Sequence, residues 1–198
     1  MDLRKQRLIE LLLVDCFRYK TDPPFTLSSG ATSPYYVDCK QLTLSAEGQA
    51  IVGALGYELA RAHEVIAVGG LTLGADPIAC AIAHHSFARS QRLQAFVVRK
   101  EPKGHGTERW IEGTVSPGSR VAVVDDVLTT GRSTQQAITH ARQAGLIVEH
   151  ALVLVDREEG GADALRAVGV EVHALVTRSE LMAVRALAQR HAEEAVIA

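Results

Sequence analysis

The chain has 198 residues, of which 47% are hydrophobic and 22% are charged, and its formal net charge is −2. This length and composition are typical of one globular domain, so we expect a single domain over residues 1–198. The small negative charge gives no general support for a nucleic-acid partner. The N-terminal residues do not resemble a secretory leader, and no apolar run approaches the length of a membrane span.

The first third of the chain predicts a helix, a strand and a second helix. Apolar residues at helical spacing suit an amphipathic helix that ends at Pro23-Pro24; they are Leu8, Ile9, Leu11 and Leu12. Residues 35–39 follow a Ser-Pro turn and predict a strand. Ser45 then caps a helix, and we expect Ile51, Leu55 and Leu59 to lie on its apolar face.

Strands and helices continue to alternate in the middle of the chain. Residues 65–68 predict a short buried strand that ends at Gly69-Gly70. A helix over 74–87 and a strand over 95–98 follow. Such alternation predicts an α/β fold around a mostly parallel sheet.

The stretch 120–134 carries the strongest functional signal. Residues 121–124 are all apolar and predict a strand buried on both faces, which leads directly into Asp125 and Asp126. The small and hydroxyl-bearing residues 129–134 open a helix that Gly145 ends. Backbone N–H groups at a helix start can bind phosphate, and paired acids suit sugar hydroxyls. Together they describe a site for a ribose 5-phosphate.

The last third predicts two more buried strands, over 148–155 and 170–176, with a short helix between them and a final helix from near Ser179. Ligands of parallel sheets bind at the carboxyl ends of the strands. Four predicted strand ends carry glycine or polar pairs: Gly69-Gly70, Arg99-Lys100, Asp125-Asp126 and Asp156-Arg157. We expect these four pairs to converge on one site.

The segment 99–109 separates two strands and contains little that could be buried. Its positive side chains are Arg99, Lys100, Lys103, His105 and Arg109, and its glycines Gly104 and Gly106 permit movement. Composition alone is equally compatible with a solvated loop. A lid that closes over an anionic leaving group would use these cations and exclude water.

The motif Asp125-Asp-Val-Leu-Thr-Thr-Gly-Arg-Ser133 resembles the phosphoribosyl diphosphate (PRPP) signature of type I phosphoribosyltransferases. Further motifs, in the same order as in that family, resemble those of orotate phosphoribosyltransferases. They are Phe25-Thr-Leu-Ser-Ser-Gly, Ser33-Pro-Tyr-Tyr-Val-Asp, Gly70-Leu-Thr-Leu-Gly-Ala-Asp-Pro, Arg99-Lys-Glu-Pro-Lys-Gly-His-Gly and Val155-Asp-Arg-Glu-Glu-Gly. The resemblance implies the type I phosphoribosyltransferase fold, with a small N-terminal hood and a mobile lid loop.

The resemblance also implies roles for individual residues. The PRPP-binding residues would be Arg99, Lys100, Lys103, His105, Asp125, Asp126, Val127, Leu128, Thr129, Thr130, Gly131, Arg132 and Ser133. Thr129 and Arg157 would contact orotate, and Lys103 would be the catalytic cation. Mg²⁺ would be carried by PRPP with few if any direct protein ligands. A homodimer would share its active sites, because part of each lid would reach the neighbouring subunit.

Two positions depart from the family pattern. Many bacterial members carry Lys where this chain has Ser28, and some carry Tyr-Lys where it has Thr72-Leu73. Both changes remove positive charge, so pyrophosphate affinity is expected to depend more strongly on the lid.

The implied activity is an Mg²⁺-dependent transfer of ribose 5-phosphate from PRPP to N1 of orotate, which gives orotidine 5′-phosphate in pyrimidine biosynthesis. Three alternatives stay open. A phosphoribosyltransferase for another base would have little use for Arg157, and a PRPP-sensing regulator would bind without turnover. The chain could also be one subunit of a larger pyrimidine-pathway assembly.

The remaining signals concern compartment and metals. The three cysteines, Cys16, Cys39 and Cys80, are odd in number and form no C-x-x-C pair, which favours reduced thiols in a cytoplasmic protein. The eight histidines show no H-x-x-x-H spacing, and the pair His84-His85 indicates a helix surface or packing rather than a metal site.

Overall fold

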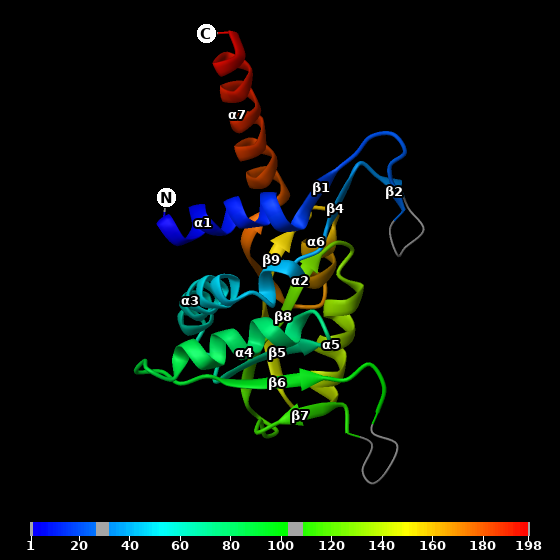
Figure 1. The fold of residues 1–198 in the computed structure, drawn as a ribbon. Helices are drawn as coiled ribbons and strands as arrows, with labels where there is room; N and C mark the ends of the chain where they lie inside the picture. Colours follow the sequence, from blue (N-terminus) through cyan, green and yellow to red (C-terminus); the bar gives the residue numbers. More distant parts are fainter. Residues whose placement is uncertain (1, 27–31, 103–108, 198) are drawn as a thin grey trace.

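A computed structural model describes residues 2–26, 32–102 and 109–197, with side chains up to residue 190. Its centre is a six-stranded sheet in the order β10-β9-β8-β5-β6-β7 (Figure 1). The strands are β5 (Ala67–Leu71), β6 (Gln94–Val98), β7 (Ile111–Gly113), β8 (Arg120–Leu128), β9 (Ile147–Asp156) and β10 (Glu171–Thr177). Neighbouring strands are parallel except for β6 and β7. The predicted α/β fold with a mostly parallel sheet is therefore confirmed.

Helices cover both faces of this sheet. The core on one face includes residues of α1 (Leu3–Leu11), α3 (Ala46–Ala62) and α4 (Ala75–Ser86), and the other includes residues of α5 (Arg132–Gln143) and α6 (Gly161–Arg166). Strand β8 serves both cores: Ala122 and Val124 pack on the first side, whereas Val121 and Val123 pack on the second. This alternation explains why the run 121–124 is apolar throughout.

The N-terminal segment forms a small layer of its own. Helix α1 continues into a π-helical turn, η1 (Leu12–Cys16), and then into β1 (Phe17–Tyr19). The predicted helix end at Pro23-Pro24 is therefore wrong, because β1 leaves the helical path to pair with β4 (Tyr35–Val37). A second small pair joins β2 (Phe25–Thr26) to β3 (Thr32–Ser33), and α2 (Lys40–Thr43) leads into α3.

Helix α3 begins where the sequence predicts, because the Ser45 hydroxyl accepts a hydrogen bond from the Gly48 N–H at 3.0 Å. Ile51, Leu55 and Leu59 pack against the core as predicted, although they are only partly buried. The fully buried positions include Val52, Gly53, Gly56, Tyr57 and Ala60. Two glycines define that face because they let α3 lie close against α4.

Replacing Gly53 by Ala should destabilise the protein. The new Cβ would lie 2.6 Å from the carbonyl oxygen of Ala81 in α4, so the two helices would have to separate. We expect a loss of about 1–3 kcal/mol, despite the better helix propensity of Ala. Urea denaturation measures the change, with the exposed Glu58→Ala in the same helix as control. A stabilised Gly53→Ala protein would contradict the close contact.

Two strand ends differ from the prediction, and one strand of the sheet was not predicted. Strand β5 passes through Gly69-Gly70 and continues to Leu71, because the absence of side chains lets the neighbouring backbones approach. Strand β8 includes both acids and ends at Leu128, since its pairing with β9 continues to that point. Strand β7 was not predicted at all, and it adds an antiparallel edge beyond the lid segment.

The remaining predicted helices are confirmed as α4, α5, α6 and α7 (Arg178–Ile197). Figure 1 shows α7 extending away from the rest of the molecule. None of the helices in the described part of the chain has both the length and the apolar character that a membrane span requires.

Candidate functional site

The four predicted strand ends lie side by side at the carboxyl edge of the sheet. The Thr72 N–H, just after β5, donates to the carbonyl oxygen of Val98 at 2.9 Å, which places Arg99 beside the turn after β5. The Arg157 N–H, just after β9, donates to the carbonyl oxygen of Leu128 at 2.9 Å. The glycine and polar pairs at the four strand ends, which are far apart in the sequence, therefore lie close together in the structure.

Asp125 is the buried acid of this edge. Its Oδ2 accepts hydrogen bonds from Thr134 Oγ1 at 2.6 Å and from Ser133 Oγ at 2.9 Å, and its Oδ1 accepts one from the Asp126 N–H at 3.0 Å. Burial raises the pKa of Asp125 to about 6, and the neighbouring Asp126 charge adds to that rise, while the hydroxyl donors oppose it. The side chain thus joins the end of β8 to the first turn of α5.

Asp126 faces the turn that follows β5. A Cβ at Gly74 would lie only 2.7 Å from its Oδ1, so the absent side chain of Gly74 makes room for this carboxylate. Its Oδ2 lies 3.9 Å from Lys40 Nζ, and Lys40 also contacts Asp38 Oδ1 at 3.3 Å. Burial lowers the pKa of Lys40, but the two carboxylates outweigh it and the net change is upward.

The turn between β5 and α4 is shaped by its own polar contact. Thr72 Oγ1 donates to Asp76 Oδ2 at 2.6 Å, and the Thr72–Leu73 peptide bond is cis. Asp76 Oδ1 is buried and has no hydrogen-bond partner among the described residues. The departure at Thr72-Leu73 thus places a hydroxyl that bonds Asp76 where some family members carry Tyr-Lys.

The helix start predicted to bind phosphate begins with a glycine. Gly131 precedes α5 with φ of +79°, a conformation that favours glycine, and no side chain caps the helix. The backbone N–H groups of the first turn are therefore available to an anion. Of the predicted residues, Thr130, Arg132 and Ser133 are exposed, whereas Leu128 is fully buried and contributes only backbone groups.

The segment after β9 packs against the loop that leads into α5. A Cβ at Gly161 would overlap the carbonyl oxygen of Thr129, and one at Gly131 would lie 3.2 Å from the carbonyl oxygen of Gly161. Two glycines thus let the phosphate motif and the segment 156–161 touch through their backbones. Thr129 and Arg157, the two residues predicted to bind orotate, lie on these adjoining segments.

Arg157 is 4% exposed and is held by three neighbouring side chains. Its Nη2 donates to Glu159 Oε1 at 2.8 Å and to Ser33 Oγ at 3.3 Å, and its guanidinium lies 4.5 Å from the ring centre of Tyr35. The Arg157 Nε is buried and has no partner within the described ranges. The ion-pair partner of Arg157 is therefore Glu159.

The predicted lid cations are only partly described. Lys103 and His105, like Gly104, Gly106 and Ser28, lie outside the described residues. Arg99 Nη1 lies 3.3 Å from Glu112 Oε1, and the Arg99 N–H donates to the carbonyl oxygen of Trp110 at 2.9 Å. The two flanks of the segment 103–108 are therefore joined to each other at the sheet edge.

Sequence reasoning missed several side chains of this site. Lys40, Tyr35 and Glu159 reach it from the N-terminal layer and from the turn after β9. Tyr35 OH donates to Glu159 Oε1 at 2.7 Å and accepts from Arg178 Nη1 at 3.2 Å. The available signal was that Tyr35 and Glu159 lie inside quoted motifs and Lys40 lies two residues after one. Only the fold shows which carboxylate each cation meets.

Known proteins resemble this chain in both sequence and structure. No protein-family model matches the chain. An orotate phosphoribosyltransferase of Aquifex aeolicus is 47% identical over 180 residues, which cover 91% of this chain and 98% of that protein. One from Thermosynechococcus vestitus is 46% identical, covering 92% of this chain and 94% of that protein.

Solved structures agree with the sequence relatives. Orotate phosphoribosyltransferase of Mycobacterium tuberculosis, solved in complex with PRPP, has a TM-score of 0.74 and 35% identity to this chain. The match covers 90% of this chain and 98% of that structure. Nearly complete coverage at such identity, together with the converging strand ends, leads to one conclusion: the chain belongs to the orotate phosphoribosyltransferase family.

Proposed function

We propose that the protein transfers ribose 5-phosphate from PRPP to N1 of orotate and thereby serves pyrimidine nucleotide biosynthesis. The bond between C1 of the ribose and N1 of orotate forms as the bond from C1 to the pyrophosphate oxygen breaks. The products are orotidine 5′-phosphate and pyrophosphate. The observation that carries this proposal is the meeting of the paired acids, the uncapped start of α5 and buried Arg157 at one sheet edge.

The end of β8 and the start of α5 would hold the ribose 5-phosphate. Asp125 and Asp126 would accept hydrogen bonds from the ribose hydroxyls, and charged acceptors make such bonds strong. Residues 127–133 would hold the 5-phosphate through backbone N–H groups and hydroxyls, favoured by the α5 dipole. Ser133 Oγ already donates to Asp125, so its N–H is the better candidate for phosphate.

Cations would hold the pyrophosphate as its charge develops. Arg99 and Lys100 stand at the carboxyl end of β6, next to the turn that contains Thr72. We propose that Lys103 and His105 join them, with Lys103 stabilising the transition state. No covalent intermediate with the protein is required, because positioning and charge stabilisation carry the reaction.

The orotate carboxylate would bind at Arg157, with Thr129 beside it. The unpartnered Arg157 Nε supports this, because a buried donor without an acceptor is costly and a ligand carboxylate would satisfy it. The Tyr35 ring and Ser33 hold the guanidinium from the other side. A base without an acidic substituent would leave this donor unsatisfied, which favours orotate over purines and uracil.

Mg²⁺ is the expected cofactor, and the residues of the site fit it. Magnesium prefers oxygen ligands and usually keeps several waters, and this edge offers the carboxylates of Asp125 and Asp126 and the unpartnered Asp76 Oδ1. When bound with PRPP, the ion would neutralise part of the pyrophosphate charge. We expect it to bind mainly through the oxygens of PRPP.

We further propose a cytoplasmic homodimer with shared active sites. The cysteines support the compartment, because Cys16, Cys39 and Cys80 are all free thiols. The dimer follows from the family resemblance, in which part of the lid segment reaches the neighbouring subunit.

Replacing Arg157 by Ala tests the assignment of the base. With PRPP and Mg²⁺ present, the KM for orotate should rise about 10- to 100-fold while the KM for PRPP changes little, because one charge-assisted hydrogen bond is lost. Steady-state kinetics with orotate, uracil and purines in turn measures both the substrate class and this effect. The exposed Arg166→Ala serves as control. Equal losses for both substrates would indicate that Arg157 only supports the fold.

A further inference from the structure

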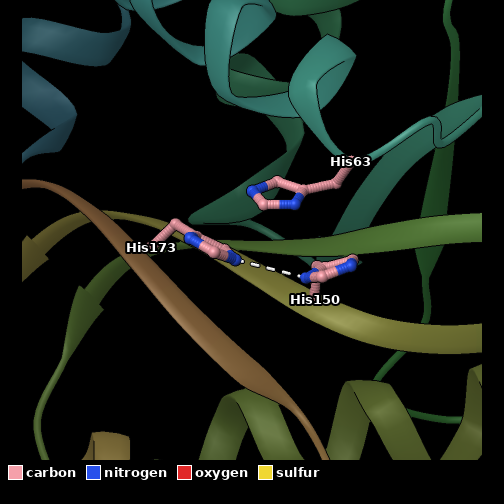
Figure 2. A group of neighbouring side chains, drawn as sticks. All are labelled: His63, His150 and His173. Carbon is pink, nitrogen blue, oxygen red and sulfur yellow. Dashed lines mark hydrogen bonds between the residues drawn. The ribbon is translucent and has the colours of Figure 1, made fainter.

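Three histidines from different elements meet at the opposite end of the sheet from the catalytic residues. His63 follows the C-terminus of α3, His150 lies near the start of β9, and His173 lies near the start of β10 (Figure 2). His150 shares a strand face with Leu152 and Leu154, which pack in the core on the α3 side. That register turns His150 toward the end of α3.

The ring nitrogens lie close enough to bind one ion. His150 Nδ1 and His173 Nε2 are 3.2 Å apart, and one ring nitrogen from each of the three histidines lies within 4.8 Å of the others. Two nitrogens bound to one tetrahedral zinc at about 2.0–2.1 Å are about 3.3–3.4 Å apart. The pair in β9 and β10 thus already has the spacing of two ligands of one metal.

Glu171 adds an oxygen to the same cluster. Its Oε2 lies 3.9 Å from His150 Nδ1 and 3.8 Å from His173 Nε2. These two distances are about 0.5 Å longer than the spacing of two ligands on one zinc, so the exposed Glu171 side chain would move inward to bind the ion. Glu171 pairs with His150 across the two strands, so the sheet register fixes its position.

His63 contributes the third imidazole ring of the cluster. Its ring centre lies 4.1 Å from that of His150 and 4.0 Å from that of His173, with interplanar angles of 26° and 32°. In this arrangement the His63 ring lies over the other two rings, and a rotation of its side chain would direct a nitrogen toward them. His63 is half-buried and directly follows the C-terminus of α3.

We infer that His63, His150, His173 and Glu171 form a binding site for one divalent transition-metal ion, with Zn²⁺ the best match. Three imidazoles and one carboxylate are ligands that zinc accepts in tetrahedral sites, whereas magnesium prefers oxygen. Burial lowers the pKa values of His150 and His173, which favours the neutral imidazole that a metal requires. The ion would connect the end of α3 to strands β9 and β10.

This metal site would stabilise the fold rather than take part in the reaction. Asp156 follows His150 by six positions in β9, a distance of about 20 Å along the strand. The ion would instead join the sheet edge to the helix layer. Metal bound only by the folded state stabilises it in proportion to the logarithm of its concentration.

The test measures the binding of Zn²⁺ alone to the full-length, chelator-treated protein. Calorimetry should give one site per chain, and Zn²⁺ at about 100 times its Kd should raise the Tm by about 5–10 °C. His150→Ala, His173→Ala and His63→Ala should each weaken binding at least tenfold, and Glu171→Gln should weaken it less. Mg²⁺ at the same concentration should not compete.

The exposed His84→Ala is the matched control, and phosphoribosyltransferase activity without added zinc reports whether each variant is folded. Cobalt substitution separates this site from the exposed Cys80, because thiolate ligation gives an intense charge-transfer band and histidine ligation does not. Loss of zinc binding in the cluster variants, with activity kept and His84→Ala unchanged, supports the site. Zinc binding that survives His150→Ala and His173→Ala, or a thiolate band with cobalt, overturns it.

Discussion

Replacing Lys103 by Ala is expected to lower kcat by about 10²- to 10³-fold while changing the KM for orotate much less. The leaving pyrophosphate gains negative charge as its bond to C1 breaks, and a cation that acts mainly at that moment affects kcat. Losing one such donor typically costs about 2.7–4 kcal/mol of transition-state stabilisation. Steady-state kinetics with PRPP and orotate, confirmed by single-turnover measurements, tests this.

Arg120→Ala is the control for this substitution, because Arg120 is an exposed cation at the start of β8 that pairs with Glu149 at 2.8 Å. A large rise in the KM for orotate with an unchanged kcat would refute the role given to Lys103. Mixing Lys103→Ala with Asp126→Asn subunits adds a test of the shared site. If the lid of one subunit serves its neighbour, the mixture should regain activity that neither variant has alone.

The strands and their polar ends could be predicted because both are local properties of the sequence. The run 121–124 is apolar because β8 packs on two cores, and such a run is recognisable without knowing the neighbours. The extension of β8 through Asp125 to Leu128 was not predictable in the same way. It depends on pairing with β9, whose partner residues lie almost 30 positions further along the chain, from Val153 to Asp156.

Contacts between distant residues account for most of what the sequence did not predict. Arg157 and Ser33 are 124 positions apart, and no local pattern links them. The buried face of α3 depends on Gly53 and Gly56, which an apolar periodicity does not count. The histidine cluster is the clearest case, because His63, His150 and His173 have no metal-binding spacing in the sequence and meet only through the packing of α3 on β9 and β10.

Asp125→Asn should make the protein more stable at neutral pH, relative to wild type, than at acid pH. The pKa of Asp125 is raised from 3.8 to about 6 in the folded state, mainly by burial. Between these two pH values, Asp125 is therefore protonated in the folded protein but ionised in the unfolded chain. The resulting stabilisation is fully present below about pH 4 and is lost as the pH rises through 6.

An asparagine does not ionise, so the variant does not lose this stabilisation. Its free energy of unfolding, compared with that of wild type, should rise by about 3 kcal/mol between pH 4 and pH 7 and then level off. Urea denaturation across this range measures the change, with the exposed Asp163→Asn as the control. A constant difference for Asp125→Asn would mean that burial does not disfavour the charge.

The same substitution should lower kcat/KM for PRPP by about 10- to 100-fold, because the ribose hydroxyls lose a charged acceptor. The gain in relative stability towards neutral pH would then accompany a loss of activity at the same residue. A purely structural acid that accepts bonds from Ser133 and Thr134 should lose stability when its charge is removed, with little effect on PRPP. For Asp125 we expect the reverse, because its buried charge destabilises the folded state at neutral pH. The charge is kept because it binds the ribose hydroxyls of PRPP.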